Sequence, residues 1–122
     1  MSESNAQRAR DGYEAIMRGD LDAIGELLDP DVKWHAGDPS YGCQNRKQAL
    51  EWMRQNWLRR EAPPGELVEM LDGGDTVVLI MRRIGEDGEP ELVANLTTFR
   101  DGKVVEMVHY PNPDDARAAA GI

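Results

Sequence analysis

The second half of the chain restricts the fold most, because four apolar segments follow one another there, separated by turn sequences. These segments are residues 67–71, 76–84, 91–99 and 103–111. The stretches between them, DGGD, GEDGEP and RDG, are rich in the Gly, Asp and Pro residues that form tight turns. Short turns join strands that run antiparallel, so this half is predicted to be an antiparallel meander.

The first half has helical spacing instead. A first predicted helix ends near Gly19, and a second begins after Asp20, a suitable N-cap. A third begins at about Asn45, which has capping-box spacing to Gln48. Residues 32–36 alternate in polarity, which predicts a short strand between the second and third helices. The inner faces of the three helices are assigned to Ala9, Tyr13, Ile16 and Met17, then Leu21, Ile24, Leu27 and Leu28, then Leu50, Met53 and Trp57.

Helices first and antiparallel strands second predict an α+β domain, with N-terminal helices packed on one face of a curved, mainly antiparallel sheet. A length of 122 residues is enough for one domain, so residues 1–122 are expected to form a single unit. Residues 113–122 are expected to be a short C-terminal helix or tail.

Composition excludes several classes of function. The net charge of −9 disfavours a nucleic acid or an anionic membrane as partner, since both need clustered Lys and Arg. No apolar run could span a bilayer and no signal peptide is evident, so a cytoplasmic location is expected. The single cysteine, Cys43, cannot form an internal disulfide, and the only two histidines lack a neighbouring carboxylate motif. We therefore expect no metal site, and because the sequence has no glycine-rich phosphate loop we expect no cofactor.

The last turn decides which side chains of the final two strands share a face. A type I turn with Gly102 as a left-handed bulge would place Phe99 opposite Lys103, Asn95 opposite Met107 and Val93 opposite His109. The shared inner face would then consist of Val93, Asn95, Thr97, Phe99, Val105, Met107 and His109. Glu106 would point away from the helices, which avoids burying a carboxylate. A two-residue turn would shift the strands by one residue.

Three stretches of sequence carry a family resemblance, namely RDGYEAIMRGDLDAIGELLDPDVKWH, GCQNRKQALEW and FRDGKVVEMVHYPNPDDARAAAG. In this order and spacing the chain resembles the SnoaL-like proteins of the nuclear-transport-factor-two-like superfamily over nearly its whole length. The resemblance implies a cone-shaped fold whose curved sheet encloses an apolar pocket, usually in a dimer. Enzymes of that superfamily include ketosteroid isomerase, polyketide cyclases, scytalone dehydratase and limonene epoxide hydrolase, so the fold alone does not define an activity.

Comparison with ketosteroid isomerase implies roles for individual residues. Met107 and His109 match the alternate residues of the last strand that line the pocket of that enzyme. Asn95 occupies the position of its protonated aspartate, an oxyanion-hole donor. Ala36 stands roughly where that enzyme has its general-base aspartate, and Tyr13 lies near the place of its catalytic tyrosine. The base of the isomerase reaction is therefore missing from its usual position.

The leading hypothesis is a cofactor-free enzyme that transfers a proton in an apolar, oxygenated small molecule, as in isomerisation, cyclisation or dehydration. His109 would shuttle the proton because its usual pKa of about 6.5 suits that role, and Asn95, with Thr97 or Tyr41, would stabilise an enolate-like oxygen. The carbon skeleton would contact large apolar side chains, namely Trp34, Trp52, Met53, Met81 and Met107.

Other polar residues are assigned to structure or left open. His35 is expected at the surface or pocket rim, Asp38 is a turn residue or else a base, and Tyr13 belongs to the first-helix core. Only one of Arg82 and Arg83 can face inward, because their parities differ.

Two further expectations accompany the catalytic hypothesis. The alternative is a binding module that holds a hydrophobic ligand or a partner in the same pocket without chemistry. The opposite sheet face would carry several apolar residues that need cover, which predicts a homodimer through that face. These residues are Leu92, Ala94, Leu96, Val104, Val108 and Tyr110.

Overall fold

A computed structural model describes residues 4–55, 65–85 and 87–122 of the chain. The helices are α1 (Asn5–Met17), α2 (Leu21–Leu27), a short 3-10 helix η1 (Pro39–Tyr41), α3 (Arg46–Met53) and α4 (Pro113–Ala120). The strands are β1 (Leu28–His35), β2 (Glu66–Asp72), β3 (Thr76–Ile84), β4 (Pro90–Arg100) and β5 (Lys103–Tyr110). The prediction that Trp57 faces inward lies outside the described residues.

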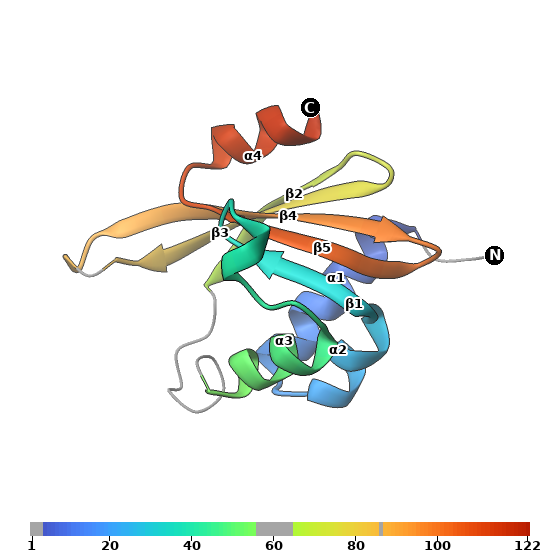
Figure 1. Cartoon of the computed structure of the whole chain (residues 1–122). Coiled ribbons are helices and arrows are strands. Elements are labelled where there is room, and N and C mark those ends of the chain that lie inside the picture. Colours follow the sequence, from blue (N-terminus) through green and yellow to red (C-terminus); the bar gives the residue numbers. More distant parts are fainter. Residues whose placement is uncertain (1–3, 56–64, 86) are drawn as a thin grey trace.

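The five strands form one sheet in the order β1-β5-β4-β3-β2. Neighbours from β2 to β5 are antiparallel, as their short turns require, whereas β1 pairs with β5 in parallel. Helices α1, α2 and α3 cover one face of this sheet and α4 lies over the other (Figure 1). We call the face toward α1–α3 the inner face and the face toward α4 the outer face. The α+β class and the antiparallel meander predicted from sequence are confirmed.

The helix starts follow from capping residues that the sequence displays. The Asp20 carboxylate accepts a hydrogen bond from the Ala23 backbone N–H at 3.1 Å, and the Asn45 side chain accepts one from the Gln48 N–H at 2.9 Å. These acceptors satisfy N–H groups that have no partner within the helix. In contrast, β1 begins at Leu28 and not at Val32, because Leu28 already pairs with Val104 of β5.

The terminal hairpin corrects the predicted register. Asp101 and Gly102 both adopt positive φ, 52° and 78°, so two residues close the turn and Arg100 lies opposite Lys103. Val104 then pairs with Phe99, and the register shifts between Phe99 and Thr98, leaving Val105 as the extra residue of a bulge. The shorter turn alone would have moved the inner side chains of β5 to the outer face, and the extra residue of the bulge returns them to the inner face. Thr97 therefore pairs with Met107 and Asn95 with His109.

The residues of β4 and β5 that face inward were therefore predicted only partly correctly. Asn95, Thr97 and Met107 lie on the inner side as expected, but Val104 takes the place predicted for Val105 and belongs to the inner core. The expected pairs Asn95–Met107 and Val93–His109 are wrong by two residues, because the turn is one residue shorter and the strand carries a bulge.

The outer face finds most of its apolar cover within the chain. Ala94, Leu96 and Val108 are buried in a cluster with Ala116 of α4. Helix α4 was expected only as a helix or tail, so the sequence-based reason for a dimer, an uncovered outer face, is largely removed. What stays open is the end of the sheet beyond α4, where Leu92 is 46% exposed and Ile84 is 67% exposed.

Gly42 holds the loop after η1 against β1. Backbone hydrogen bonds join Trp34 and the neighbouring Cys43 in both directions, at 3.0 and 2.7 Å. A Cβ at position 42 would lie 1.9 Å from the Trp34 carbonyl oxygen, so this approach requires glycine. The close contact fixes the loop to the strand.

We expect Gly42→Ala to lower the free energy of unfolding by about 1–3 kcal/mol, because backbone must shift to relieve the overlap. Urea denaturation measures the change. Gly25→Ala in α2 is the control, since its Cβ would meet only a Leu50 side-chain atom at 3.4 Å. Alanine there should raise stability by about 0.5–1 kcal/mol. Equal effects of the two substitutions would contradict this role of Gly42.

Candidate functional site

Two adjacent cavities lie on the inner face of the sheet. The first, which we call the mouth pocket, has a volume of about 510 Å³ and opens between β1, η1, α3 and the adjoining ends of β3, β4 and β5. The second, the inner cavity, is smaller, about 80 Å³, and lies deeper between α1, α2 and the sheet. Trp34, Met81 and Asn95 line both. These three residues therefore lie where the two spaces adjoin, which we call the junction.

Aromatic rings form one wall of the mouth pocket. The Trp34 and Trp52 rings meet edge to face, with centroids 4.8 Å apart and an interplanar angle of 68°. Trp52 is 40% exposed and Tyr41, at the margin of the pocket, is 89% exposed. Ring surfaces of this size suit a flat apolar ligand.

Asn95 and His109 lie opposite each other on adjacent strands and both line the mouth pocket. Directly opposed side chains on one face have Cβ atoms about 4.5–5.5 Å apart, so both can reach the same small group. The Asn95 Oδ1 atom is buried without a hydrogen-bond partner among the described residues. None of the described side chains or backbone groups hydrogen-bonds the His109 ring either. A buried amide oxygen without a partner is costly, and a ligand in the pocket could pair with it.

The charge state of His109 follows from its surroundings. Burial lowers the pKa of His109 below 6.5, and the positive charge of Arg83 lowers it further, while Glu91 partly offsets this. The ring is therefore neutral at pH 7. A neutral imidazole with an unpaired nitrogen can accept a proton from a ligand.

The two neighbouring arginines lie on opposite faces. Arg83 lines the mouth pocket, and its Nε donates to Glu91 Oε1 at 2.8 Å. Arg82 lies on the outer face, where its Nη2 donates to Glu66 Oε2 at 3.0 Å. Strand parity could have decided this from sequence, because Arg83 is two residues beyond Met81, which was already assigned to the pocket.

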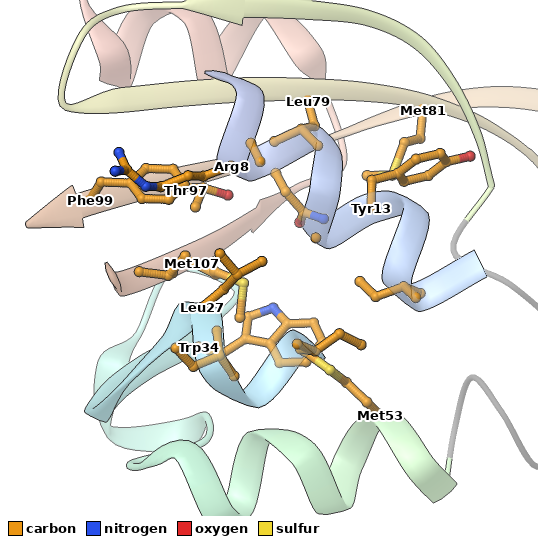
Figure 2. A pocket seen from close by; sticks show the side chains of 17 residues that line it. Arg8, Tyr13, Leu27, Trp34, Met53, Leu79, Met81, Thr97, Phe99 and Met107 are labelled. Atoms are coloured by element: carbon orange, nitrogen blue, oxygen red, sulfur yellow. The ribbon is translucent and has the colours of Figure 1, made fainter. Parts of the chain in front are cut away.

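The inner cavity is lined mainly by apolar side chains. Figure 2 shows Leu79, Phe99 and Met107 from the sheet facing Leu27 and Met53 from the helices. The Tyr13 hydroxyl donates to the Gly65 carbonyl at 2.7 Å and accepts from the Leu67 N–H at 3.0 Å. Tyr13 therefore fastens α1 to β2 and has no spare hydroxyl proton for catalysis.

His35 was expected at the surface or pocket rim, and it contributes to the lining of the mouth pocket but is buried and not exposed. Its Nε2 lies 3.0 Å from Glu106 Oε2, and its Nδ1 accepts the Gly37 N–H at 3.0 Å. Both ring nitrogens are occupied, so His35 is a structural histidine. Sequence reasoning missed the pairing because Glu106 is remote in the chain.

Two further residues have structural explanations. Asp38 accepts hydrogen bonds from the Ser40 N–H and hydroxyl, which lower the pKa of its carboxyl group, and it caps η1 as a turn residue. Burial raises the pKa of the Cys43 thiol, so it stays protonated at neutral pH.

All nine residues proposed from sequence for the site line at least one of the two cavities. His109, Tyr41 and Trp52 line the mouth pocket only, and Thr97, Met53 and Met107 line the inner cavity only. Thr97 is thus separated from His109. Arg8 from α1 and Gln48 from α3 also contribute, without any sequence signal that marked them. Among the described residues, no three His, Cys, Asp or Glu side chains gather to hold a metal ion.

Comparison with known proteins identifies the family. Residues 9–107 match the sequence profile of the SnoaL-like domain. The chain belongs to the SnoaL-like domain family. No curated protein matches its sequence.

Solved structures similar to this SnoaL-like domain share its fold. An NTF2-like protein of unknown function from Burkholderia pseudomallei is 19% identical, with 99% of this chain and 100% of that chain covered and a TM-score of 0.71. A protein of unknown function with a cystatin-like fold from Xanthomonas campestris is 20% identical over 93% of this chain and 97% of its own, with a TM-score of 0.74.

A third, provisionally named a polyketide cyclase, comes from Sinorhizobium meliloti. It is 21% identical, with 84% of this chain and 93% of that chain covered and a TM-score of 0.70. The cone-shaped α+β fold expected from the resemblance is confirmed. No helix in the described part of this SnoaL-like domain has the length and apolar character needed to cross a membrane.

Proposed function

We propose that this SnoaL-like domain is a cofactor-free enzyme that transfers a proton in an apolar, oxygenated small molecule bound in the mouth pocket. The supporting observation is the Asn95–His109 pair, whose members oppose each other on β4 and β5, line the same pocket and have no hydrogen-bond partner for their side chains among the described residues. Polar groups of a structural core are normally paired. The buried Asn95 oxygen without a partner beside a cavity, with the half-buried His109 ring on the same cavity, is better explained by a ligand.

The proposed step moves one proton and no other group. The neutral His109 imidazole takes a proton from the carbon next to a carbonyl group, the C–H electron pair forms a C=C bond, and the carbonyl electrons move onto oxygen. The Asn95 amide donates a hydrogen bond to that oxygen as its charge grows. Where the substrate carries a further C=C bond beside that carbon, the enolate electrons re-form the carbonyl, the double bond shifts, and the far carbon takes the proton from the imidazolium, which completes an isomerisation. Trp34, Trp52 and Met81 contact the carbon skeleton.

Exchange of hydrogen for deuterium tests this step without knowledge of the natural substrate. β-Tetralone, an apolar bicyclic ketone, is incubated with the protein in heavy water, and NMR follows deuterium entering beside the carbonyl. The proposal expects exchange faster than in buffer. Binding of β-tetralone in the pocket without faster exchange would favour the alternative, a protein that holds a hydrophobic ligand without chemistry.

The exchange rate should depend on pH through His109. Because its pKa in the folded protein lies below 6.5, the base form predominates at neutrality, and the rate should be flat above pH 6.5 and fall below it. The unfolded chain binds this proton near pH 6.5, so His109 lowers the free energy of unfolding as pH falls from 6.5 through the folded pKa. NMR titration of the ring and a pH–rate profile measure both. A rate that rises with acidification would contradict a basic role for His109.

We also propose a homodimer through the outer face, formed by the part that α4 leaves open. Leu92 and Ile84 are exposed there beside the Arg82–Glu66 ion pair. Light scattering is expected to give twice the chain mass of 13.6 kDa, and Leu92→Arg should give the single mass because it places a charge in the contact. A wild-type protein that stays monomeric at high concentration would contradict the dimer.

A further inference from the structure

We propose that the ligand of this pocket is an apolar carboxylic acid, inserted with its apolar end toward the inner cavity and its carboxylate on Arg83 at the mouth. This inference rests on the proposed function, since it names the class of molecule on which His109 and Asn95 would act. It draws on three features: the free part of the Arg83 guanidinium, the change of polarity along the cavities, and the junction between them.

Arg83 offers hydrogen-bond donors that the protein does not use. Its Nε donates to Glu91 at 2.8 Å, and neither of its terminal nitrogens has a partner within the described chain. Its side chain is 46% exposed while it lines the mouth pocket. The planar guanidinium fork matches a carboxylate in two parallel hydrogen bonds.

The number of charges at the mouth favours a single negative charge on the ligand. Arg83 is the only Lys or Arg among the described residues that line the mouth pocket, and His109 is neutral at pH 7. Glu91 already balances part of the Arg83 charge, so a phosphate with close to two charges would lack cations here, whereas a singly charged carboxylate can still pair with the terminal guanidinium nitrogens. The net charge of −9 acts weakly at this contact, because salt screens exposed charges beyond about 8 Å.

Polarity falls along the path from the mouth to the interior. The mouth pocket includes Arg83, Gln48 and His109, and the junction includes Asn95. The inner cavity is walled mainly by apolar groups such as Leu79 and Phe99, and its one charged lining residue among those described, Arg8, donates to Asn5 at 3.1 Å. An acid with an apolar tail matches this order, because its tail loses contact with water while its charge stays at the partly exposed end. With the carboxylate on Arg83, the carbon chain would run toward the Asn95–His109 pair, which lines the same pocket.

Isothermal calorimetry with octanoate and 1-octanol tests the charge preference. These probes share one chain length, so the ratio of their dissociation constants isolates the contribution of the carboxylate. We expect octanoate to bind the wild-type protein about tenfold more tightly. Arg83→Gln should bring the ratio close to one. Arg82→Gln, which removes the neighbouring arginine from the opposite face, should leave it unchanged.

The inner cavity is tested by chain length. Each methylene that enters an apolar site strengthens binding roughly threefold to fourfold, so octanoate should bind about tenfold more tightly than hexanoate. Leu79→Phe fills part of the cavity and should reduce this ratio, whereas Leu79→Met, of similar volume, should keep it. Thermal unfolding of each variant verifies that it is folded.

Failure of this inference is distinguishable from failure of the proposed function. His109→Gln should lose β-tetralone exchange and still bind octanoate more tightly than 1-octanol, because Arg83 is unchanged. The inference is overturned if octanoate does not bind, or if it binds no better than 1-octanol. It is also overturned if Arg83→Gln and Arg82→Gln weaken octanoate binding equally. In each case exchange that depends on His109 would still support the proposed function.

Discussion

His109→Gln is expected to slow the exchange of β-tetralone by about 10²–10⁴-fold, the usual contribution of a general base. Glutamine keeps a polar side chain of similar reach but cannot take up the proton. The folded state should be little affected, because the imidazole has no hydrogen-bond partner among the described residues and is only partly buried. Exchange rates and unfolding curves of the same preparation separate the loss of chemistry from a loss of structure.

Chemical rescue sharpens the test of His109. His109→Ala leaves space at the edge of the mouth pocket, so added imidazole should enter and restore part of the exchange rate in proportion to its concentration. The same imidazole should not accelerate the wild-type protein beyond its effect in buffer. Full exchange activity in either variant would remove His109 from the mechanism.

Asn95→Leu is expected to have opposite effects on activity and stability. Loss of a donor to a developing oxyanion costs about 10²–10³ in rate. The substitution also removes a buried amide oxygen that has no partner, so the free energy of unfolding should stay unchanged or rise by about 1 kcal/mol. A gain in stability with a loss of function is typical of a residue kept for chemistry.

Thr98→Val is the control for Asn95 because it alters a polar residue of the same strand at an outer-face position opposite Glu106. Its exchange rate should match that of the wild type. If Asn95→Leu instead unfolds at a lower urea concentration than the wild type, while its folded fraction catalyses exchange at the normal rate, then Asn95 is a structural amide and the oxyanion role is wrong.

The sequence predicted the parts of the fold that depend on local signals. Asp20 and Asn45 cap helices as expected, and the Gly-rich and Asp-rich stretches end strands near the predicted residues. These signals act within a few residues of each other, so a single sequence displays them.

The register of the last hairpin shows where local signals are insufficient. Asp101-Gly102 fits two turn types, and only tertiary packing decides between them. The bulge at Val105 then returns Met107 and His109 to the inner side. The predicted face of Met107 and His109 was therefore right although the predicted pairs were not.

The cavity could be predicted only from its strand side. Alternation along β4 and β5 indicated Asn95 and Met107, whereas Met81 was chosen as a large, flexible apolar side chain. Alternation along β3 from Met81 would have indicated Arg83. Helical contributions such as Arg8 depend on how α1 crosses the sheet, and the His35–Glu106 contact depends on the parallel pairing of β1 with β5. No local pattern encodes either arrangement.

The central claim is that Asn95 and His109 act on one ligand in one pocket, and NMR of isotope-labelled protein tests it most directly. β-Tetralone is titrated while the His109 ring signals and the Asn95 side-chain amide signals are followed together. We predict that both move along a single saturation curve with one dissociation constant, while the His35 ring signals, held by Glu106 and Gly37, move little. Saturation that shifts neither residue, or that shifts only one of the two, would contradict the account.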